Sequence, residues 1–164
     1  MELFFKEKLS LNGKVEITDA EENVLYSGKE SFWTGKLIMK DGEGNKLVTI
    51  KPGKTIFTRG FYIKQGFKTI GKMKQKISIV NQKFKVKKLD WDVKGDFLAS
   101  EYTITKGDEV IAEVKKAKLI ALLETYSINV TNDEDVANVV AVCLILNRIL
   151  KSKKKNLANK VLKK

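Results

Sequence analysis

The sequence predicts a mainly β protein, in which a closed antiparallel β-barrel of about twelve strands encloses one hydrophobic C-terminal α-helix. Three observations support this fold class. Short runs of β-forming residues repeat along residues 3–130, turn residues separate these runs, and residues 133–150 form one largely apolar segment. A helix that is apolar on nearly every face has to be enclosed, and a closed sheet encloses it while leaving no exposed edges.

The expected strands are short and are joined by turns, as in an antiparallel barrel or sandwich. Segment 41–45, DGEGN, places Asp-Gly between two β-rich runs, which is a strong hairpin signal. Segment 106–108, KGD, separates two further runs in the same way. The predicted runs are 3–8, 14–18, 24–27, 36–40, 46–51, 55–58, 61–65, 68–73, 76–80, 84–89, 91–93, 97–105, 109–115, 118–123 and 125–130.

The segment 133–150 is predicted to be the enclosed helix, because only Asn138 is polar among residues 136–146. Thr131 and Glu134 fit a capping box at its start, and Arg148 has the right charge for its end. As a helix, the apolar run covers roughly 16 Å, whereas the hydrocarbon of a bilayer is about 30 Å thick. The sequence therefore predicts no transmembrane span.

Length and composition indicate one domain over residues 1–150, followed by a lysine-rich tail over residues 151–164. The 164 residues are 43% hydrophobic, which suits a single core. Cys143 is the only cysteine, so no internal disulfide can form, and the first residues lack the apolar region of a signal peptide. These features indicate a cytoplasmic protein, with a peripheral membrane location as a further option.

The net charge of +12 is concentrated in the tail, which holds seven lysines and no acidic residue. Residues 1–150 carry 25 basic and 20 acidic residues, and Arg59 and Arg148 are the only arginines in the chain. Lysine is a hydrated point charge without the planar fork that reads base edges. The sequence therefore predicts attraction to polyanions and argues against specific nucleic-acid recognition.

The chain offers little for catalysis, because it contains no histidine and therefore no common general base or zinc ligand set. Cys143 lies in an apolar run, so core packing is favoured over a nucleophilic role. Asp90, Asp92 and Asp96 alternate with strand residues, which favours a solvated strand face over a calcium site. Segment 41–45 lacks the GK[ST] of a phosphate loop. No enzyme, cofactor or metal site is predicted.

Lysines also gather in the predicted strands, at residues 83–88 and 115–118. Alternating lysines are more typical of a solvated face that protects a sheet edge than of an anion site. Exposed aromatic residues among the lysines would support nucleic-acid binding, but a core or barrel-rim position explains Phe32, Trp33, Phe61, Tyr62 and Trp91 at least as well. In the tail, Leu157, Ala158, Val161 and Leu162 give a small apolar stripe beside lysines. Either a basic amphipathic helix on an anionic membrane or a solubilising extension fits this pattern.

The order of hairpins, the segment 89–116 and the final apolar helix resemble the LURP-one-related family over residues 1–150. The matching residues are Trp91, Val93, Gly95, Phe97, Tyr102, Ile104, Val110, Ile111, Ala112 and Val114. The family is related to the tubby C-terminal domain and to phospholipid scramblases, so the resemblance implies a barrel of about twelve strands threaded by a central helix. Tubby domains bind phosphoinositides, but no motif in this sequence identifies equivalent phosphate ligands. The tail after Leu150 departs from the shared pattern.

Three functions remain. The first is a noncatalytic barrel that binds anionic phospholipid or a membrane surface, the second is a structural or protein-interaction module with an unidentified protein partner, and the third is nonspecific nucleic-acid binding. Salt dependence separates charge-driven binding from the second function, and dependence on the lipid headgroup separates the first from the third. The candidate anion-binding residues are Lys151, Lys153, Lys154, Lys155, Lys160, Lys163 and Lys164.

Overall fold

The computed structural model describes residues 1–6, 14–31, 33–53, 60–74, 83–97, 99, 101–120 and 123–161. The side chains of residues 6, 118–120, 123–124 and 151–161 fall outside this description. The predicted runs 55–58 and 76–80 also lie outside it.

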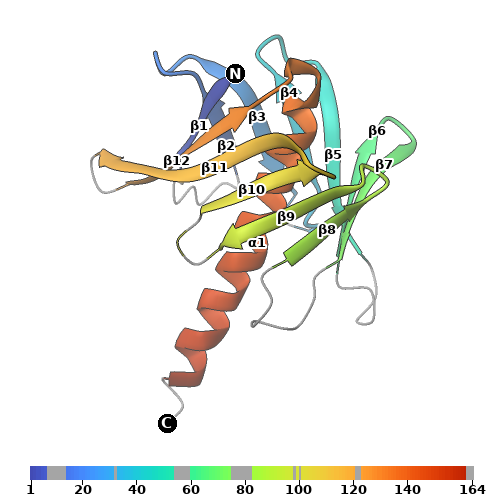
Figure 1. Ribbon diagram of the computed structural model, residues 1–164. Helices are drawn as coiled ribbons and strands as arrows, with labels where there is room; N and C mark the ends of the chain where they lie inside the picture. Colours follow the sequence, from blue (N-terminus) through green and yellow to red (C-terminus); the bar gives the residue numbers. More distant parts are fainter. Residues whose placement is uncertain are drawn as a thin grey trace.

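Twelve antiparallel strands form one closed barrel, in which each strand pairs with its neighbours in the sequence and β1 pairs with β12 (Figure 1). This architecture confirms the predicted fold class. The strands are β1 (Glu2–Lys6), β2 (Lys14–Thr18), β3 (Val24–Glu30), β4 (Leu37–Asp41), β5 (Lys46–Pro52), β6 (Gly60–Gln65), β7 (Lys68–Lys74), β8 (Lys83–Lys87), β9 (Trp91–Asp96), β10 (Glu101–Lys106), β11 (Glu109–Ile120) and β12 (Leu123–Val130).

The strands turn their apolar residues inward because side chains alternate between the two faces of a strand. In β8, Phe84 and Val86 are buried while the lysines on either side of them are exposed. The seam between β1 and β12 obeys the same rule, since Leu3 faces Ile128 across it and both are buried. The inner faces of the barrel therefore form one continuous apolar lining.

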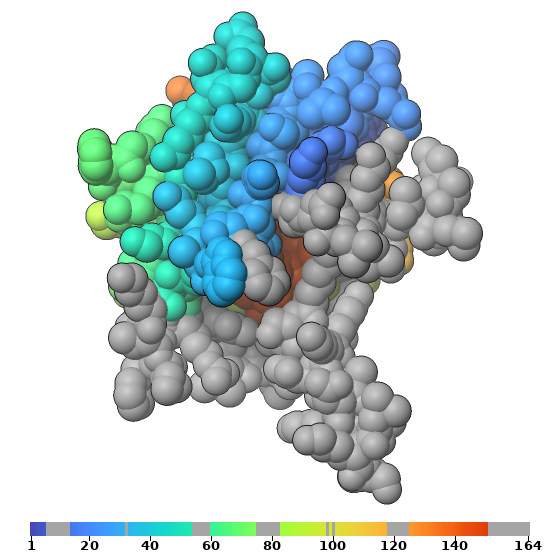
Figure 2. All heavy atoms as spheres, turned by 180° about the vertical axis from the view of Figure 1, so that it is seen from behind, coloured from blue at the N-terminus to red at the C-terminus, as the bar shows by residue number. Residues whose placement is uncertain are grey.

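The core is completed by the chain's last helix, which begins with the 3₁₀ turn η1 (Asp133–Asp135) and continues as α1 (Val136–Val161). All eight residues from 139 to 146 are buried. Successive helix positions differ by about 100°, so these eight residues point in every direction around the axis. The helix is therefore enclosed, as predicted, and Figure 2 shows its orange-to-red surface only in small areas between atoms of other segments.

Two details of the helix differ from the prediction. The helix does not end near Leu150 but continues to Val161, because residues 151–161 contain neither Gly nor Pro and are rich in the helix formers Lys, Leu and Ala. The capping box is also absent. Asn132 occupies the N-cap position without a side-chain hydrogen bond, and the Thr131 hydroxyl instead donates to the Val110 carbonyl oxygen at 2.7 Å.

Tight turns join the strands at one end of the barrel, and the β4–β5 turn confirms the hairpin predicted from DGEGN. The Asp41 carboxylate accepts from the backbone N–H groups of Glu43 (3.0 Å) and Asn45 (2.8 Å). The β2–β3 turn repeats this pattern, with Asp19 accepting from the Asn23 N–H at 2.8 Å. We call this end, which also carries η1, the turn end, and we call the opposite end, from which α1 emerges, the exit end.

Candidate anion-binding surfaces

The helix α1 leaves the barrel at the exit end and projects from it (Figure 1). Five of the seven predicted lysines lie on this projecting part, residues 151–161: Lys151, Lys153, Lys154, Lys155 and Lys160. Lys163 and Lys164 lie outside the described residues.

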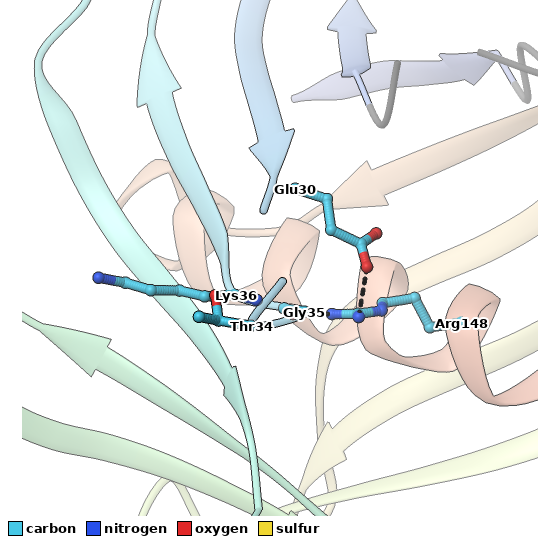
Figure 3. A network of polar contacts seen from close by, with 5 residues as sticks. All are labelled: Glu30, Thr34, Gly35, Lys36 and Arg148. Atoms are coloured by element: carbon cyan, nitrogen blue, oxygen red, sulfur yellow. Dashed lines mark hydrogen bonds and ion pairs between the residues drawn. The ribbon is translucent and has the colours of Figure 1, made fainter. Parts of the chain in front are cut away.

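Arg148 fastens the exit end of α1 to the loop between β3 and β4 (Figure 3). Its guanidinium donates to the Gly35 carbonyl oxygen at 2.8 Å and to the Glu30 carboxylate at 2.6 Å. It also lies over the Phe61 ring, 5.4 Å from the ring centroid. Because Arg148 and Glu30 are both partly buried, this pair is less screened than an exposed one. The loop is therefore held against the helix three residues before Lys151.

Sequence reasoning treated Arg148 only as a charge near a helix end. The rarity of arginine, which occurs only at residues 59 and 148, was the available signal, because the planar guanidinium holds its donors in a fixed fork that suits two acceptors and an aromatic ring, whereas lysine is a flexible point charge. The acceptors themselves, Glu30 and Gly35, lie more than 110 positions away in the sequence.

A second basic surface, which we call the lysine wall, covers the outer faces of β5–β9. Lys72 lies directly opposite Lys87, and Lys83 lies directly opposite Lys94. Like charges placed directly opposite each other destabilise a sheet. The members of the wall are Lys51, Lys64, Lys72, Lys74, Lys83, Lys85, Lys87 and Lys94.

The sequence singled out residues 83–88 but gave no sign of their partners on β7 and β9, because strand register is invisible without the fold. Some of these lysines have their charge engaged. Lys85 forms a 2.9 Å ion pair with Asp90, and Lys88 donates to the Thr69 carbonyl oxygen at 3.0 Å. In the other predicted group, Lys115 pairs with Glu113 at 2.9 Å. The structure thus places one lysine-rich surface on the wall and another on the projecting helix.

The turn end has the opposite charge. Its turns comprise residues 19–23, 41–45, 66–67, 88–90, 107–108 and 131–135, and they carry Lys88 as their single basic residue. Their ten acidic residues are Asp19, Glu21, Glu22, Asp41, Glu43, Asp90, Asp108, Asp133, Glu134 and Asp135. Burial, with the nearby Asp133 and Asp41 carboxylates, raises the pKa of Tyr26. Lys46, Lys68 and Lys106 adjoin these turns, so the turn end has an excess of acidic residues but also carries exposed lysines.

The predicted aspartate group at residues 90–96 has structural partners. Asp90 pairs with Lys85, as described above, and the Asp96 carboxylate accepts from the Ala99 N–H at 3.1 Å. Among the described residues, no three carboxylate or thiol groups gather where they could hold a metal ion. The described part of the chain also contains no helix that is long and apolar enough to cross a bilayer.

Cys143 lies inside the barrel, where it shares a hydrogen bond with the Tyr102 hydroxyl. Burial raises the pKa of the thiol from its ordinary value of 9.0 to about 12, and the hydrogen bond from Tyr102 partly offsets this rise. Burial also raises the pKa of Tyr102. Because the thiolate is the reactive form, Cys143 is a packing residue.

Native Cys143 should therefore fail to react with a thiol reagent at pH 8 and should react fully in denaturant. The free energy of unfolding should also fall as the pH rises from about 9 toward 12, because the unfolded thiol ionises there while the folded thiol keeps its proton. Ellman titration with and without urea, and urea denaturation at pH 8 and 10, would measure both effects. Rapid labelling of the folded protein would contradict the enclosed position.

Comparison with known proteins agrees with this architecture. Residues 1–147 match the LURP-one-related family. The chain is 28% identical over 153 residues to the uncharacterized protein YxjI of Bacillus subtilis (strain 168), and the match covers 92% of this chain and 94% of YxjI. An X-ray structure of the Arabidopsis thaliana protein AT5G01750 matches with a TM-score of 0.67 at 20% identity, covering 90% of this chain and 91% of that one, and it supports the fold alone. The family match spans the whole barrel and most of the enclosed part of the helix, and the chain therefore belongs to the LURP-one-related family.

Proposed function

We propose that this protein is a noncatalytic barrel that binds anionic phospholipid surfaces from the cytoplasm through the lysines of residues 151–164. The observation that carries the proposal is the continuation of α1 beyond the barrel, with five lysines and no acidic residue in residues 151–161. The projecting helix carries these charges at the end of the barrel opposite the acidic turns. The kinship of the family with tubby domains and scramblases supports the same class of ligand.

Electrostatics supports both an affinity and an orientation. Each lysine near an anionic membrane contributes about 1 kcal/mol at moderate ionic strength, and the attraction fades within a Debye length of the surface. Ten acidic residues at the turn end would be repelled by the same surface. The barrel would therefore bind with its exit end toward the lipid.

Liposome co-sedimentation tests the proposal, using neutral and anionic vesicles at low and high salt. In the first variant, the five lysines of the projecting helix are replaced with glutamine, which keeps the helix propensity close to that of lysine. The matched control replaces five lysines of the wall, Lys72, Lys74, Lys83, Lys87 and Lys94, so both variants lose the same charge. The wild type should bind only anionic vesicles, and the helix variant should bind at least about tenfold more weakly.

The wall variant should keep most of its binding. Equal binding by the helix variant and the wild type would overturn the proposal, and loss of binding by the wall variant alone would move the site to β5–β9. Competition with double-stranded DNA tests the nucleic-acid function. If the protein recognises lipid headgroups, it should keep its preference among lipids of equal surface charge when DNA is present. Failure to bind any vesicle would favour the structural or protein-interaction function.

A further inference from the structure

We propose that Trp33, in the loop between β3 and β4, is an aromatic anchor that enters the headgroup region of an anionic bilayer. This inference rests on the proposed function and adds a second, apolar contact to it. The two tryptophans of the chain have opposite environments: Trp33 is 89% exposed, whereas Trp91 is 2% exposed and belongs to the core. The sequence left both in the core or at the barrel rim, and the structure assigns Trp91 to the core and Trp33 to the rim.

An exposed tryptophan is costly in water and suits the membrane interface. The indole ring has an apolar body and one polar N–H, so it prefers the depth at which one side is wet and the other is apolar. Lysines alone hold a protein at the surface without entering it. Trp33 would supply the part of the binding that persists when salt screens the charges.

The position of the loop places Trp33 at the end of the barrel from which α1 projects. The loop joins the ends of β3 and β4 at the exit end. Backbone hydrogen bonds of 2.8 Å from the Ser31 N–H to the Lys36 carbonyl oxygen, and from the Gly35 N–H to the Ser31 carbonyl oxygen, close it. Arg148 then ties Gly35 to α1 at 2.8 Å, as Figure 3 shows. Trp33 is therefore presented on a fixed loop next to the helix that continues into residues 151–161.

Gly35 is suited to this contact. Its φ of +61° is in the left-handed region, and an added Cβ would lie 3.2 Å from an Arg148 guanidinium nitrogen. A side chain at this position would strain the turn and push against the arginine. The hydrogen bonds of Ser31 and Gly35, together with the contact from Arg148, thus constrain the described part of the loop.

The turn end provides a natural control in Phe67, a fully exposed aromatic residue in the β6–β7 turn. It lies at the end where the ten acidic turn residues are found, although Lys68 follows it directly, so an anionic surface should approach it less closely than it approaches Trp33. If exposed aromatic residues bound lipid without regard to charge, Phe67 would contribute as much as Trp33.

Quenching of tryptophan fluorescence by brominated phospholipids tests the anchor in the full-length wild-type protein. Vesicles of phosphatidylserine and phosphatidylcholine, with bromines near the headgroup end of the acyl chains, should quench about half of the emission on binding, because Trp33 reaches the bromines and Trp91 stays inside the barrel. Trp33→Ala should abolish the quenching and weaken binding by about five- to tenfold at high salt. Phe67→Ala should change neither.

Failure of the anchor can be distinguished from failure of the proposed function. If the wild type binds but shows no quenching, the anchor is overturned and the lysine site stands. If the five-lysine variant still binds with full quenching, the anchor stands and the lysine site is overturned. If the wild type does not bind at all, both are overturned, and Trp33 becomes a candidate contact for a protein partner.

Discussion

Replacing Val140 with aspartate should prevent the barrel from folding. Val140 is 0% exposed and lies in the middle of the fully buried segment of α1. The new carboxylate would have to be buried without a partner or stay protonated, and either option costs several kcal/mol. That cost is comparable to the 5–15 kcal/mol by which a typical domain is stable. Far-UV circular dichroism and urea denaturation should show loss of the cooperative transition.

Two control substitutions separate the effect of a buried charge from the effects of an exposed charge and of lost side-chain volume. Val24→Asp places the same charge at a β3 residue that is 45% exposed, and it should cost less than about 1 kcal/mol. Val140→Ala removes two methyl groups without adding charge, and it should cost about 2 kcal/mol. If the Val140→Asp variant had the same midpoint of urea denaturation as the wild type, α1 could not be enclosed.

Replacing Gly95 with alanine should destabilise the protein by roughly 3 kcal/mol or more, because β9 and β10 approach each other too closely there for any side chain. An added Cβ would lie 2.3 Å from the Glu101 carbonyl oxygen and 2.5 Å from the Tyr102 Cα. These are backbone atoms, so relief requires the two strands to separate. Separation would also shift Tyr102. Its ring packs on the Phe97 ring, with 5.5 Å between the ring centroids, and its hydroxyl is hydrogen-bonded to Cys143. Urea denaturation followed by circular dichroism measures the loss.

Gly107→Ala is the matched control for Gly95→Ala. Gly107 has a φ of +59° but has no heavy atom within 4 Å of the added Cβ. In this variant the free energy of unfolding should fall by only about 1–2 kcal/mol, which is the cost of a left-handed backbone at a residue with a side chain. Equal stability losses in the two alanine variants would contradict the close approach of β9 to β10.

The fold was predictable because its main signals are local. Strand β2 was predicted at the bounds that the structure gives it, and the enclosed helix followed from composition alone. Other bounds were less accurate, since β3 and β9 extend beyond the predicted runs 24–27 and 91–93. Phe97 was predicted at the start of the run 97–105, yet it lies in the preceding turn and packs against Phe84, with 5.0 Å between the ring centroids. β11 was divided into the runs 109–115 and 118–123, although the strand continues through residues 116 and 117.

The candidate surfaces were less predictable, because they depend on which residues the barrel brings together. The tail lysines were visible as a run, but the continuous helix beneath five of them was not predicted. Neither the wall pair Lys72 and Lys87 nor the contact from Arg148 to Gly35 leaves a local signal in the sequence. The exposure of Trp33 also depends on the loop, since hydrophobicity alone assigns a tryptophan to the core.

The order of elements along the chain has a consequence for protein synthesis. The barrel closes only when β1 meets β12, and its interior is filled only by α1, which follows every strand. At 5–20 residues per second, the ribosome needs roughly 7–30 s between residue 2 and the end of the buried part of α1. During that interval the apolar inner faces of the strands have no helix to cover, so they stay open to water or to nonspecific contacts until α1 has been synthesised.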